Sequence, residues 1–421
     1  MMYKEWVCSE KDEGLSDETI IQAVKTACSA CSGNILLVPP DQSRFHSGCG
    51  HLTNCLYHLL VEDGRHVDIM PALGTHDVMS FAMIDAFLGS DIPKERILPH
   101  NWRRDTTELG KIPETFLYEI SEGVMKESVP VEINRALLQY DCVLSLGQVV
   151  PHEVVGMSGY TKNIIVGVGG SKMIGVSHLL GALYGLERML GHVDTPVRKL
   201  FDYAQEHFLN SLPILHILTV ATSQNNNTQL NGLFFGNCRK VFEQAANLSQ
   251  KKNITYLERP IKKCVVYLDP FEFHSLWIGN KAIYRTRIAM ADGGELLILA
   301  KGIKKFGEDP DNDCLLRKYG YPGREAVIRL LSESDELQSN PSAASTMIYG
   351  STEGRFHVTY CTDESLRDDI LRAGYGYGNY ENEIIKYRNC VPGWNQTQEG
   401  EEIYYINNPA IGLWTLPFID N

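Results

Sequence analysis

The sequence predicts an α/β protein in which mostly parallel sheets are layered with helices. Short apolar runs alternate with amphipathic stretches in both halves of the chain, a pattern typical of this class. The 421 residues suffice for two or three domains, and 43% are hydrophobic, as in folded globular proteins. Polar residues able to do chemistry follow several predicted strands directly, where α/β folds gather their active sites.

The first half is predicted to contain three buried strands, at residues 34–38, 67–70 and 141–145. Ser16 is of the residue type that caps helix N-termini, so a helix is predicted at residues 17–31. Further helices are predicted at 79–87 and 173–190, the second of which follows a glycine run.

The second half repeats the alternation. Strands are predicted at residues 214–220, 264–268, 296–300 and 356–360, and helices at 239–248, 281–290 and 364–373. The polar stretch 222–228 is predicted to be a surface loop. We expect an N-terminal α/β domain over residues 1–205, a loosely bounded connecting region over 206–264 and a C-terminal α/β domain over 265–421.

Composition argues against several classes of protein. The net charge of −13 disfavours a nucleic-acid or anionic-membrane surface. The sequence has no apolar run of about 18 residues that would cross a membrane, and its start lacks the apolar run of a signal peptide. The 11 cysteines are scattered and odd in number, so no disulfide framework is expected, and the lone pair Cys28 and Cys31 is predicted to pack within a helix. We therefore expect a cytoplasmic protein.

Two short segments after predicted strands carry groups suited to catalysis. Asp41 and Arg44 follow the strand at 34–38, and a guanidinium can clamp a carboxylate or phosphate. The alternative is a helix cap by Asp41 beside a surface arginine. His76 ends the turn Gly74-Thr75-His76, where we expect it near a helix N-terminus that keeps the imidazole neutral, or merely as a cap of that helix.

A third segment is the richest in polar groups, and it contains His152, Lys162, Gly167, Gly169, Gly170 and His178. A glycine run that opens a helix suits a phosphate, because backbone N–H groups and the helix dipole face it. The run is neither a Walker motif nor a dinucleotide fingerprint, and a lone histidine on an apolar helix is usually packed in the core. Spacing alone leaves both interpretations open.

Together these segments resemble the lactate racemase family, whose members carry a nickel-pincer nucleotide. The family has an Asp-x-x-Arg element, matched by Asp41 and Arg44, and a Gly-Thr-His element, matched by the turn that ends at His76. It also has a His, Lys, His series spaced by ten and then sixteen residues. His152, Lys162 and His178 reproduce that series. The matches keep their order over roughly the first half of the chain.

The resemblance implies two Rossmann-like α/β domains with the active site in the cleft between them. It implies that His76 and His152 are the acid/base pair and that Arg44 binds the substrate carboxylate. Asp41 would position either Arg44 or His76. In the implied reaction, hydride leaves C2 of a 2-hydroxy acid while a histidine takes the hydroxyl proton, which gives a 2-keto acid. Hydride returned to the other face inverts the centre.

The resemblance also implies the cofactor, pyridinium-3-thioamide-5-thiocarboxylic acid mononucleotide nickel. Lys162 would hold it covalently, and His178 would be the protein ligand to nickel. The cofactor phosphate would lie near the glycine run, at Gly167, Gly169 and Gly170. Separate maturation enzymes are implied as transient partners, besides the small-molecule substrate.

The second half departs from the family. Lactate racemases have a Gln and a Lys three residues apart that complete the substrate pocket, and this sequence lacks that element. Lys301 is the nearest candidate, with Lys304, although both could equally be solvated surface charges. The polar stretches at 308–313 and 342–345 favour a larger, hydrophilic substrate. The predicted activity is therefore an aldonate 2-epimerase of the gluconate and mannonate type, and the alternative is a racemase of lactate or malate.

Two other classes of function would require features that differ from those of this sequence. An NAD-dependent dehydrogenase would need a dinucleotide fingerprint after the first strand, and the residues after Val38 lack those glycines. A non-catalytic binding protein predicts the loss of catalytic positions, whereas all the matched positions are present.

Overall fold

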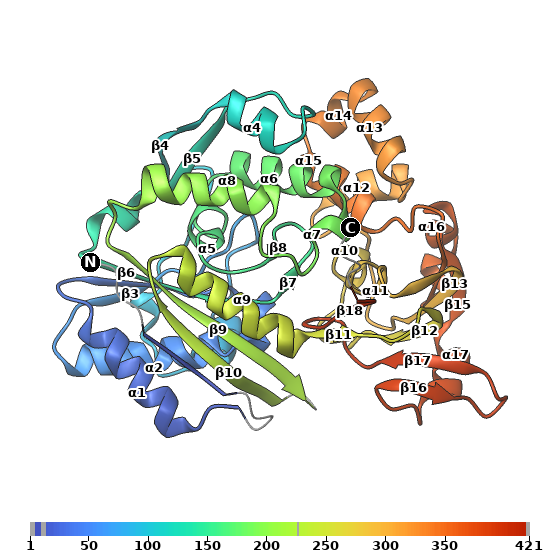
Figure 1. Cartoon of the computed structure of the whole chain (residues 1–421), viewed down its shortest axis with the longest axis horizontal. Coiled ribbons are helices and arrows are strands. Elements are labelled where there is room, and N and C mark those ends of the chain that lie inside the picture. Colours follow the sequence, from blue (N-terminus) through green and yellow to red (C-terminus); the bar gives the residue numbers. More distant parts are fainter. Residues whose placement is uncertain (1–4, 10–13, 225–226, 418–421) are drawn as a thin grey trace. The chain divides into compact units, whose positions relative to one another are not determined.

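The computed structural model describes residues 5–9, 14–224 and 227–417. Contacts between Cα atoms divide the described residues into two compact units (Figure 1). Unit 1 comprises the described parts of Met1–Leu180 and Gly191–Asn253, and unit 2 comprises those of Gly181–Leu190 and Ile254–Asn421. Each unit has its own mostly parallel sheet, which confirms the predicted α/β class.

Unit 1 is built on a six-stranded sheet in the order β1 (Glu5–Cys8), β10 (Asn227–Gly236), β9 (Ile214–Gln224), β6 (Cys142–Gln148), β2 (Ile35–Val38) and β3 (Val67–Ile69). The strands β9, β6, β2 and β3 are parallel, and β10 and β1 extend the sheet antiparallel. Every residue of β2 and β6 is buried, as expected for central strands covered on both faces. The three strands predicted in the first half are confirmed.

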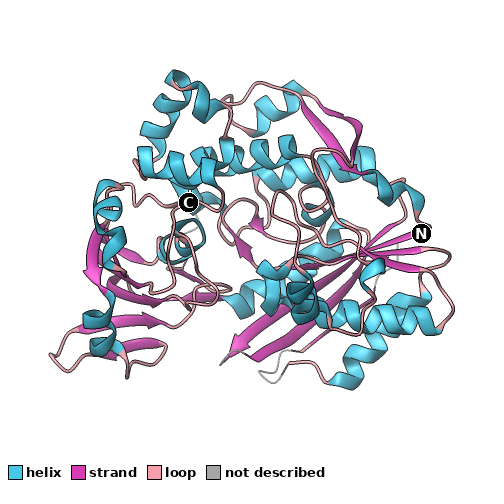
Figure 2. Cartoon of the chain, turned by 180° about the vertical axis from the view of Figure 1, so that it is seen from behind, coloured by secondary structure: helices cyan, strands magenta, loops and turns pink. Residues whose placement is uncertain are grey.

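Helices lie on both faces of this sheet (Figures 1 and 2). α1 (Asp17–Ser29) and α2 (Cys49–Glu62) pack with Ile217 and Ala221 of β9, whereas α9 (Arg239–Asn253) packs with Leu218 and Val220 of the same strand. Alternate side chains of a strand point to opposite faces, so these helices cover opposite sides. Ser16 caps α1 by accepting a hydrogen bond from the N–H of Thr19, as predicted.

The other elements that lie wholly or mainly in unit 1 are α3 (Phe81–Leu88), β4 (Thr106–Ile112), α4 (Glu114–Ile120), β5 (Val129–Asn134), β7 (Pro151–His152), β8 (Gly156–Met157), α5 (Lys162–Ile165), α6 (Ser171–Tyr184) and α8 (Pro196–Ala204). The helix predicted at 173–190 is two helices, α6 and α7 (Leu186–Met189). The break lies at Gly185, whose φ of 104° no helix accommodates.

The order of the parallel strands reverses beside β2. From β2 the chain continues to β3 on one side, and it later enters β6 on the other side. The carboxyl ends of β2 and β6 therefore form a topological switch point. Ligands of open α/β sheets bind in the crevice at such a point, because the connections diverge there.

The prediction of a surface loop at residues 222–228 is wrong. β9 extends to Gln224 and β10 begins at Asn227, so the polar stretch is the end of a long hairpin, and residues 225–226 lie outside the described residues. Backbone pairing with a neighbouring strand overrides the loop-like composition. The segment 206–264, expected to connect two domains, contains β9, β10 and α9, which belong to unit 1.

Unit 2 has a second six-stranded sheet in the order β15 (Gly376–Asn379), β14 (His357–Thr362), β13 (Met290–Leu299), β12 (Ile261–Tyr267), β17 (Glu402–Ile406) and β16 (Gly393–Gln396). All neighbours are parallel except β16, which pairs antiparallel with β17. A separate parallel pair joins β11 (Ile254–Tyr256) and β18 (Leu413–Thr415).

The helices of unit 2, besides α7, are α10 (Leu276–Gly279), α11 (Lys281–Thr286), α12 (Pro310–Tyr319), α13 (Arg324–Glu333), α14 (Asp335–Gln338), α15 (Pro341–Tyr349), α16 (Arg367–Arg372) and α17 (Tyr380–Tyr387). The helix predicted at 281–290 stops at Thr286, because β13 already begins at Met290. Within the described ranges, no helix has both the length and the apolar character to cross a bilayer.

Candidate active site

The loop after β2 fixes a buried carboxylate. Asp41 is 3% exposed, and its Oδ1 accepts hydrogen bonds from the N–H (3.0 Å) and the hydroxyl (2.5 Å) of Ser43. Its Oδ2 lies 2.6 Å from Nδ1 of His76. Burial alone would raise the pKa of Asp41, but the hydrogen bonds from His76 and Ser43 outweigh burial and hold that pKa below its usual value. Asp41 is therefore an anion that caps the short helix Gln42–Ser47 and also orients His76.

His76 lies in a turn after β3, and the expected helix N-terminus beside it is wrong. α3 begins only at Phe81, with Ser80 as its cap. Gly74 takes a φ of 58° in the turn, and its N–H donates to the carbonyl of Gly167 at 2.7 Å. Because Nδ1 of His76 donates to the Asp41 carboxylate, Nε2 carries the lone pair of the neutral ring. The His76 side chain is 59% exposed.

Asn163, the residue after Lys162, holds this part of the chain at the switch point. Nδ2 of Asn163 donates to the carbonyls of Val38 (2.9 Å) and Leu146 (3.0 Å), at the carboxyl ends of β2 and β6. α5 begins at Lys162 and is thereby fixed to both strands. Sequence reasoning missed Asn163, because an asparagine before an apolar run carries no motif of its own.

The backbone just before Lys162 is held in an unfavourable conformation. Tyr160 has a φ of 60°, which costs a residue with a Cβ roughly 1–2 kcal/mol. Its ring is 2% exposed, and its centroid lies 4.6 Å from that of His216 and 5.9 Å from that of Phe242. Its hydroxyl donates to the carbonyl of Asn237. Such strain persists where the surroundings over-determine it, and it is common at functional sites.

The environment of Lys162 makes its amine a better nucleophile than an ordinary lysine. Burial, and next the positive charge of Arg44, lower its pKa to about 8, against the opposing charges of Glu153 and Asp41. A sizeable fraction of the amine is therefore neutral near pH 7. The guanidinium of Arg44 makes no hydrogen bond or ion pair within the described part of the chain.

His178, on α6, has the hydrogen-bond arrangement of a metal ligand. Its Nδ1 donates to the carbonyl of Ile174 at 2.6 Å, which leaves the lone pair of the neutral ring on Nε2. Burial lowers its pKa to about 4, and the nearby charges of Lys162 and His76 act in the same direction. The ring is therefore neutral at physiological pH. The effect of both charges on His178 indicates that the three side chains lie near one another.

His152, at the end of β7, has the opposite tautomer to His76. It is 6% exposed, and its Nδ1 accepts a hydrogen bond from the N–H of Val154 at 3.1 Å. The proton of the neutral ring is then on Nε2. Glu153 lies close by, with 3.7 Å between its Oε2 and Nδ1 of His152, and its charge also acts on Lys162. Sequence reasoning missed Glu153.

The glycine run is required by close packing. A Cβ at Gly169 would lie 2.0 Å from the carbonyl oxygen of Ile165, and one at Gly170 would lie 2.0 Å from Oε2 of Glu132. A Cβ at Gly167 would lie 2.6 Å from that of Ala72. No side chain fits at these positions, and the phosphate site suggested for the run stays a prediction.

Lys301, the candidate from the second half, lies on the surface of unit 2. Its Nζ is 2.9 Å from Oε1 of Glu381, and its side chain is 57% exposed. The contact fits the alternative of a solvated surface charge, and a role for Lys301 in the substrate pocket stays a prediction.

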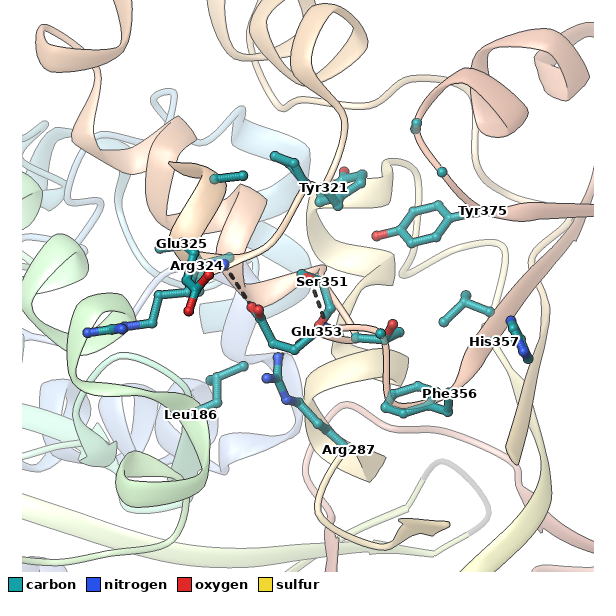
Figure 3. A pocket seen from close by; sticks show the side chains of 18 of the residues that line it. Leu186, Arg287, Tyr321, Arg324, Glu325, Ser351, Glu353, Phe356, His357 and Tyr375 are labelled. Carbon is teal, nitrogen blue, oxygen red and sulfur yellow. Dashed lines mark hydrogen bonds between the residues drawn. The ribbon is translucent and has the colours of Figure 1, made fainter. Parts of the chain in front are cut away.

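A pocket of about 880 Å³ lies in unit 2 and contains none of the predicted site residues (Figure 3). Its lining includes an ion pair and a carboxylate that accepts from a backbone N–H. Arg287 pairs with Glu187 at 2.6 Å, and the N–H of Arg324 donates to Glu353 at 2.8 Å. Among the residues that the structure describes, no group of three or more His, Cys, Asp or Glu side chains could hold a metal ion.

Comparisons with known proteins agree with this geometry. Residues 18–187 match the family model described as the lactate racemase N-terminal domain, a range that includes every predicted site residue of unit 1. The fold matches a protein from Thermotoga maritima with a TM-score of 0.83 and 23% identity, over 96% of this chain and 99% of that one. No curated protein sequence gives a significant match.

The fold also matches the lactate racemase apoprotein from Thermoanaerobacterium thermosaccharolyticum, with a TM-score of 0.70 and 16% identity, over 94% of this chain and 92% of that one. Residues 18–187 are therefore similar to the lactate racemase N-terminal domain, and the chain shares its α/β fold with the two solved structures.

Proposed function

We propose that the protein is an isomerase that inverts C2 of a 2-hydroxy acid. The observation that carries the proposal is the pair of histidines with opposite tautomers. At Nε2, His76 holds a lone pair and His152 holds a proton. Inversion needs two such groups, because the hydroxyl of the two stereoisomers approaches from different sides. One group takes the hydroxyl proton and the other returns it.

The residues of the cluster fit a nickel-pincer nucleotide, the cofactor of the resembled family. Lys162 offers an amine that is partly neutral near pH 7, as covalent attachment through a thioamide requires. His178 offers Nε2, and imidazole is a suitable nickel ligand. When bound, the cofactor supplies a hydride acceptor and donor for C2. Proteins that assemble the cofactor act as transient partners.

Arg44 binds the substrate carboxylate. Its guanidinium has no competing carboxylate within the described residues, so both terminal nitrogens are available for a bidentate contact. Together with Lys162 it concentrates positive charge in a protein whose net charge is −13. Asp41 acts through His76: it fixes the imidazole orientation and stabilises the imidazolium that forms when Nε2 takes the hydroxyl proton.

Hydride transfer avoids an unfavourable step. Removal of a carbon-bound proton beside an ionised carboxylate would give a dianion, whereas loss of hydride with loss of the hydroxyl proton gives a 2-keto acid. The test is to run the reaction in D₂O and follow C2 by NMR. Hydride transfer predicts inverted product without deuterium at C2. Deuterium at C2 in step with inversion would show proton abstraction and overturn the hydride route.

The substrate is an aldonate of the gluconate and mannonate type. This choice is supported by the missing Gln and Lys element and by the polar stretches of the second half. An NMR assay of the cofactor-loaded protein with gluconate, malate and lactate tests it, with the His76→Ala variant as the control for background reaction. A clear preference for lactate or malate would reverse the choice and leave the isomerase proposal standing.

A further inference from the structure

Two cysteines far apart in the sequence meet inside unit 1. Cys31 follows α1, and Cys142 is the first residue of β6, 111 positions later. Their sulfur atoms are 2.6 Å apart, and the residues are 5% and 4% exposed. A disulfide joins two sulfurs at about 2.05 Å, so these thiols lie within about half an ångström of bonding distance.

Hydrogen bonds that do not involve the sulfurs hold the two segments side by side. The N–H of Asn34 donates to Oδ2 of Asp141 at 2.8 Å, and its carbonyl accepts from the N–H of Cys142 at 3.2 Å. On the other side, the guanidinium of Arg65 donates to the carbonyl of Cys31. These hydrogen bonds keep the backbones of Cys31 and Cys142 close to each other.

We propose that Cys31 and Cys142 are a redox-reactive pair that forms a disulfide when the protein meets hydrogen peroxide. In the first step the Cys31 sulfur attacks one peroxide oxygen and the O–O bond breaks. The other oxygen leaves as water with the Cys31 proton, which gives a sulfenic acid. In the second step the Cys142 sulfur displaces the sulfenic hydroxyl, which leaves as water with the Cys142 proton. The two sulfurs lose two electrons, and the peroxide gains them.

A third cysteine, Cys28, lies three residues before Cys31, and the prediction that both pack within a helix is wrong for Cys31, because α1 ends at Ser29. Cys28 and Cys31 form the C-x-x-C spacing, but the sulfur in contact with Cys31 belongs to Cys142. Burial, and next the neighbouring Cys31, raise the pKa of Cys28 to about 11, so it stays a thiol at neutral pH. The contact with Cys142 and burial also raise the pKa of Cys31. Oxidation should therefore be slow at neutral pH and faster as the pH rises.

The cross-link lies away from the proposed catalytic cluster. Cys142 is at the amino end of β6, whereas His152 and Lys162 follow its carboxyl end. The disulfide would close a long loop and so restrict the unfolded chain. Oxidation should raise thermal stability and leave the Lys162 environment unchanged.

The test uses the folded full-length chain. The protein is treated with hydrogen peroxide at pH 7 and pH 9, denatured with N-ethylmaleimide to block remaining thiols, digested without reductant and mapped by mass spectrometry. We expect one cross-linked peptide pair that contains Cys31 and Cys142 and disappears with dithiothreitol. The oxidised protein should melt several degrees higher. Cys142→Ser should lose both effects, whereas Cys264→Ser, at a buried cysteine of unit 2, should keep both.

Two results would overturn the proposal. In the first, Cys31 and Cys142 remain fully alkylated at peroxide doses that have already oxidised the exposed Cys8 and Cys314. In the second, the cross-link found joins Cys28 to Cys31. Both results are read on the unmodified sequence, so neither depends on whether a variant folds.

Discussion

The amine of Lys162 should be neutral at pH 7 in a far larger fraction of molecules than an ordinary lysine amine. Burial and the charge of Arg44 lower its pKa to about 8. About one amine in ten is then neutral at pH 7, against roughly one in 2,500 for the usual lysine pKa of about 10.4. The neutral, nucleophilic fraction is therefore about 200-fold larger than that of an ordinary lysine.

Competitive labelling of the cofactor-free chain measures this fraction. Trace acetic anhydride is applied at pH values from about 6 to 11, and acetylation of each lysine peptide is followed by mass spectrometry. Lys199, exposed on α8, is the internal reference. We expect half-maximal labelling of Lys162 near pH 8, and a higher midpoint in Arg44→Met, which removes one cause of the shift. A Lys162 midpoint near 10.4 in the unmodified sequence would refute the reasoning.

Three further predictions concern the histidines of unit 1. His76→Ala or His152→Ala should lower turnover of the loaded protein by about 100- to 10,000-fold and leave the Lys162 adduct visible by mass, and near-native turnover would contradict the two-base assignment. Asp41→Asn removes the anion that binds His76 and with it a charge-assisted hydrogen bond of about 1.5–3 kcal/mol. The kcat should therefore fall about 10- to 150-fold, and an unchanged kcat would count against this role of Asp41. His216 is fully buried, neither ring nitrogen has a partner among the described residues, and burial lowers its pKa to about 3. In the unfolded chain the imidazole of His216 binds a proton near pH 6.5, so acid favours unfolding. In urea titrations, wild type should lose about 2 kcal/mol of stability between pH 7 and pH 5 through this group, and His216→Leu should not show this loss. An equally steep loss in that variant would contradict the account.

The central strands and several helices could be predicted because their sequence pattern has a local cause. β2 and β6 are buried on both faces and so appear as continuous apolar runs. Ser16 marks the start of α1 by accepting the N–H that the first helical turn leaves unsatisfied. The polar end of the hairpin of β9 and β10 could not be predicted in this way, because pairing between the strands, and not local composition, determines its structure.

The sequence predicted which residues belong to the candidate site, but it could not predict the hydrogen bonds between them. Spacing left open whether Asp41 caps a helix or orients a catalytic group. In the structure Asp41 does both: it caps a helix by accepting from Ser43, and it orients His76. That pairing joins loops from two strands, so no local pattern contains it. The same is true of Asn163, which bridges the ends of β2 and β6.

The most direct test of the account is the intact mass of the protein produced together with the cofactor maturation enzymes, beside a Lys162→Ala control. The account predicts a nickel-pincer adduct on the native sequence and none on the variant. No adduct on the native sequence, with the maturation system proven on another family member, would contradict the proposed cofactor and the chemistry that depends on it.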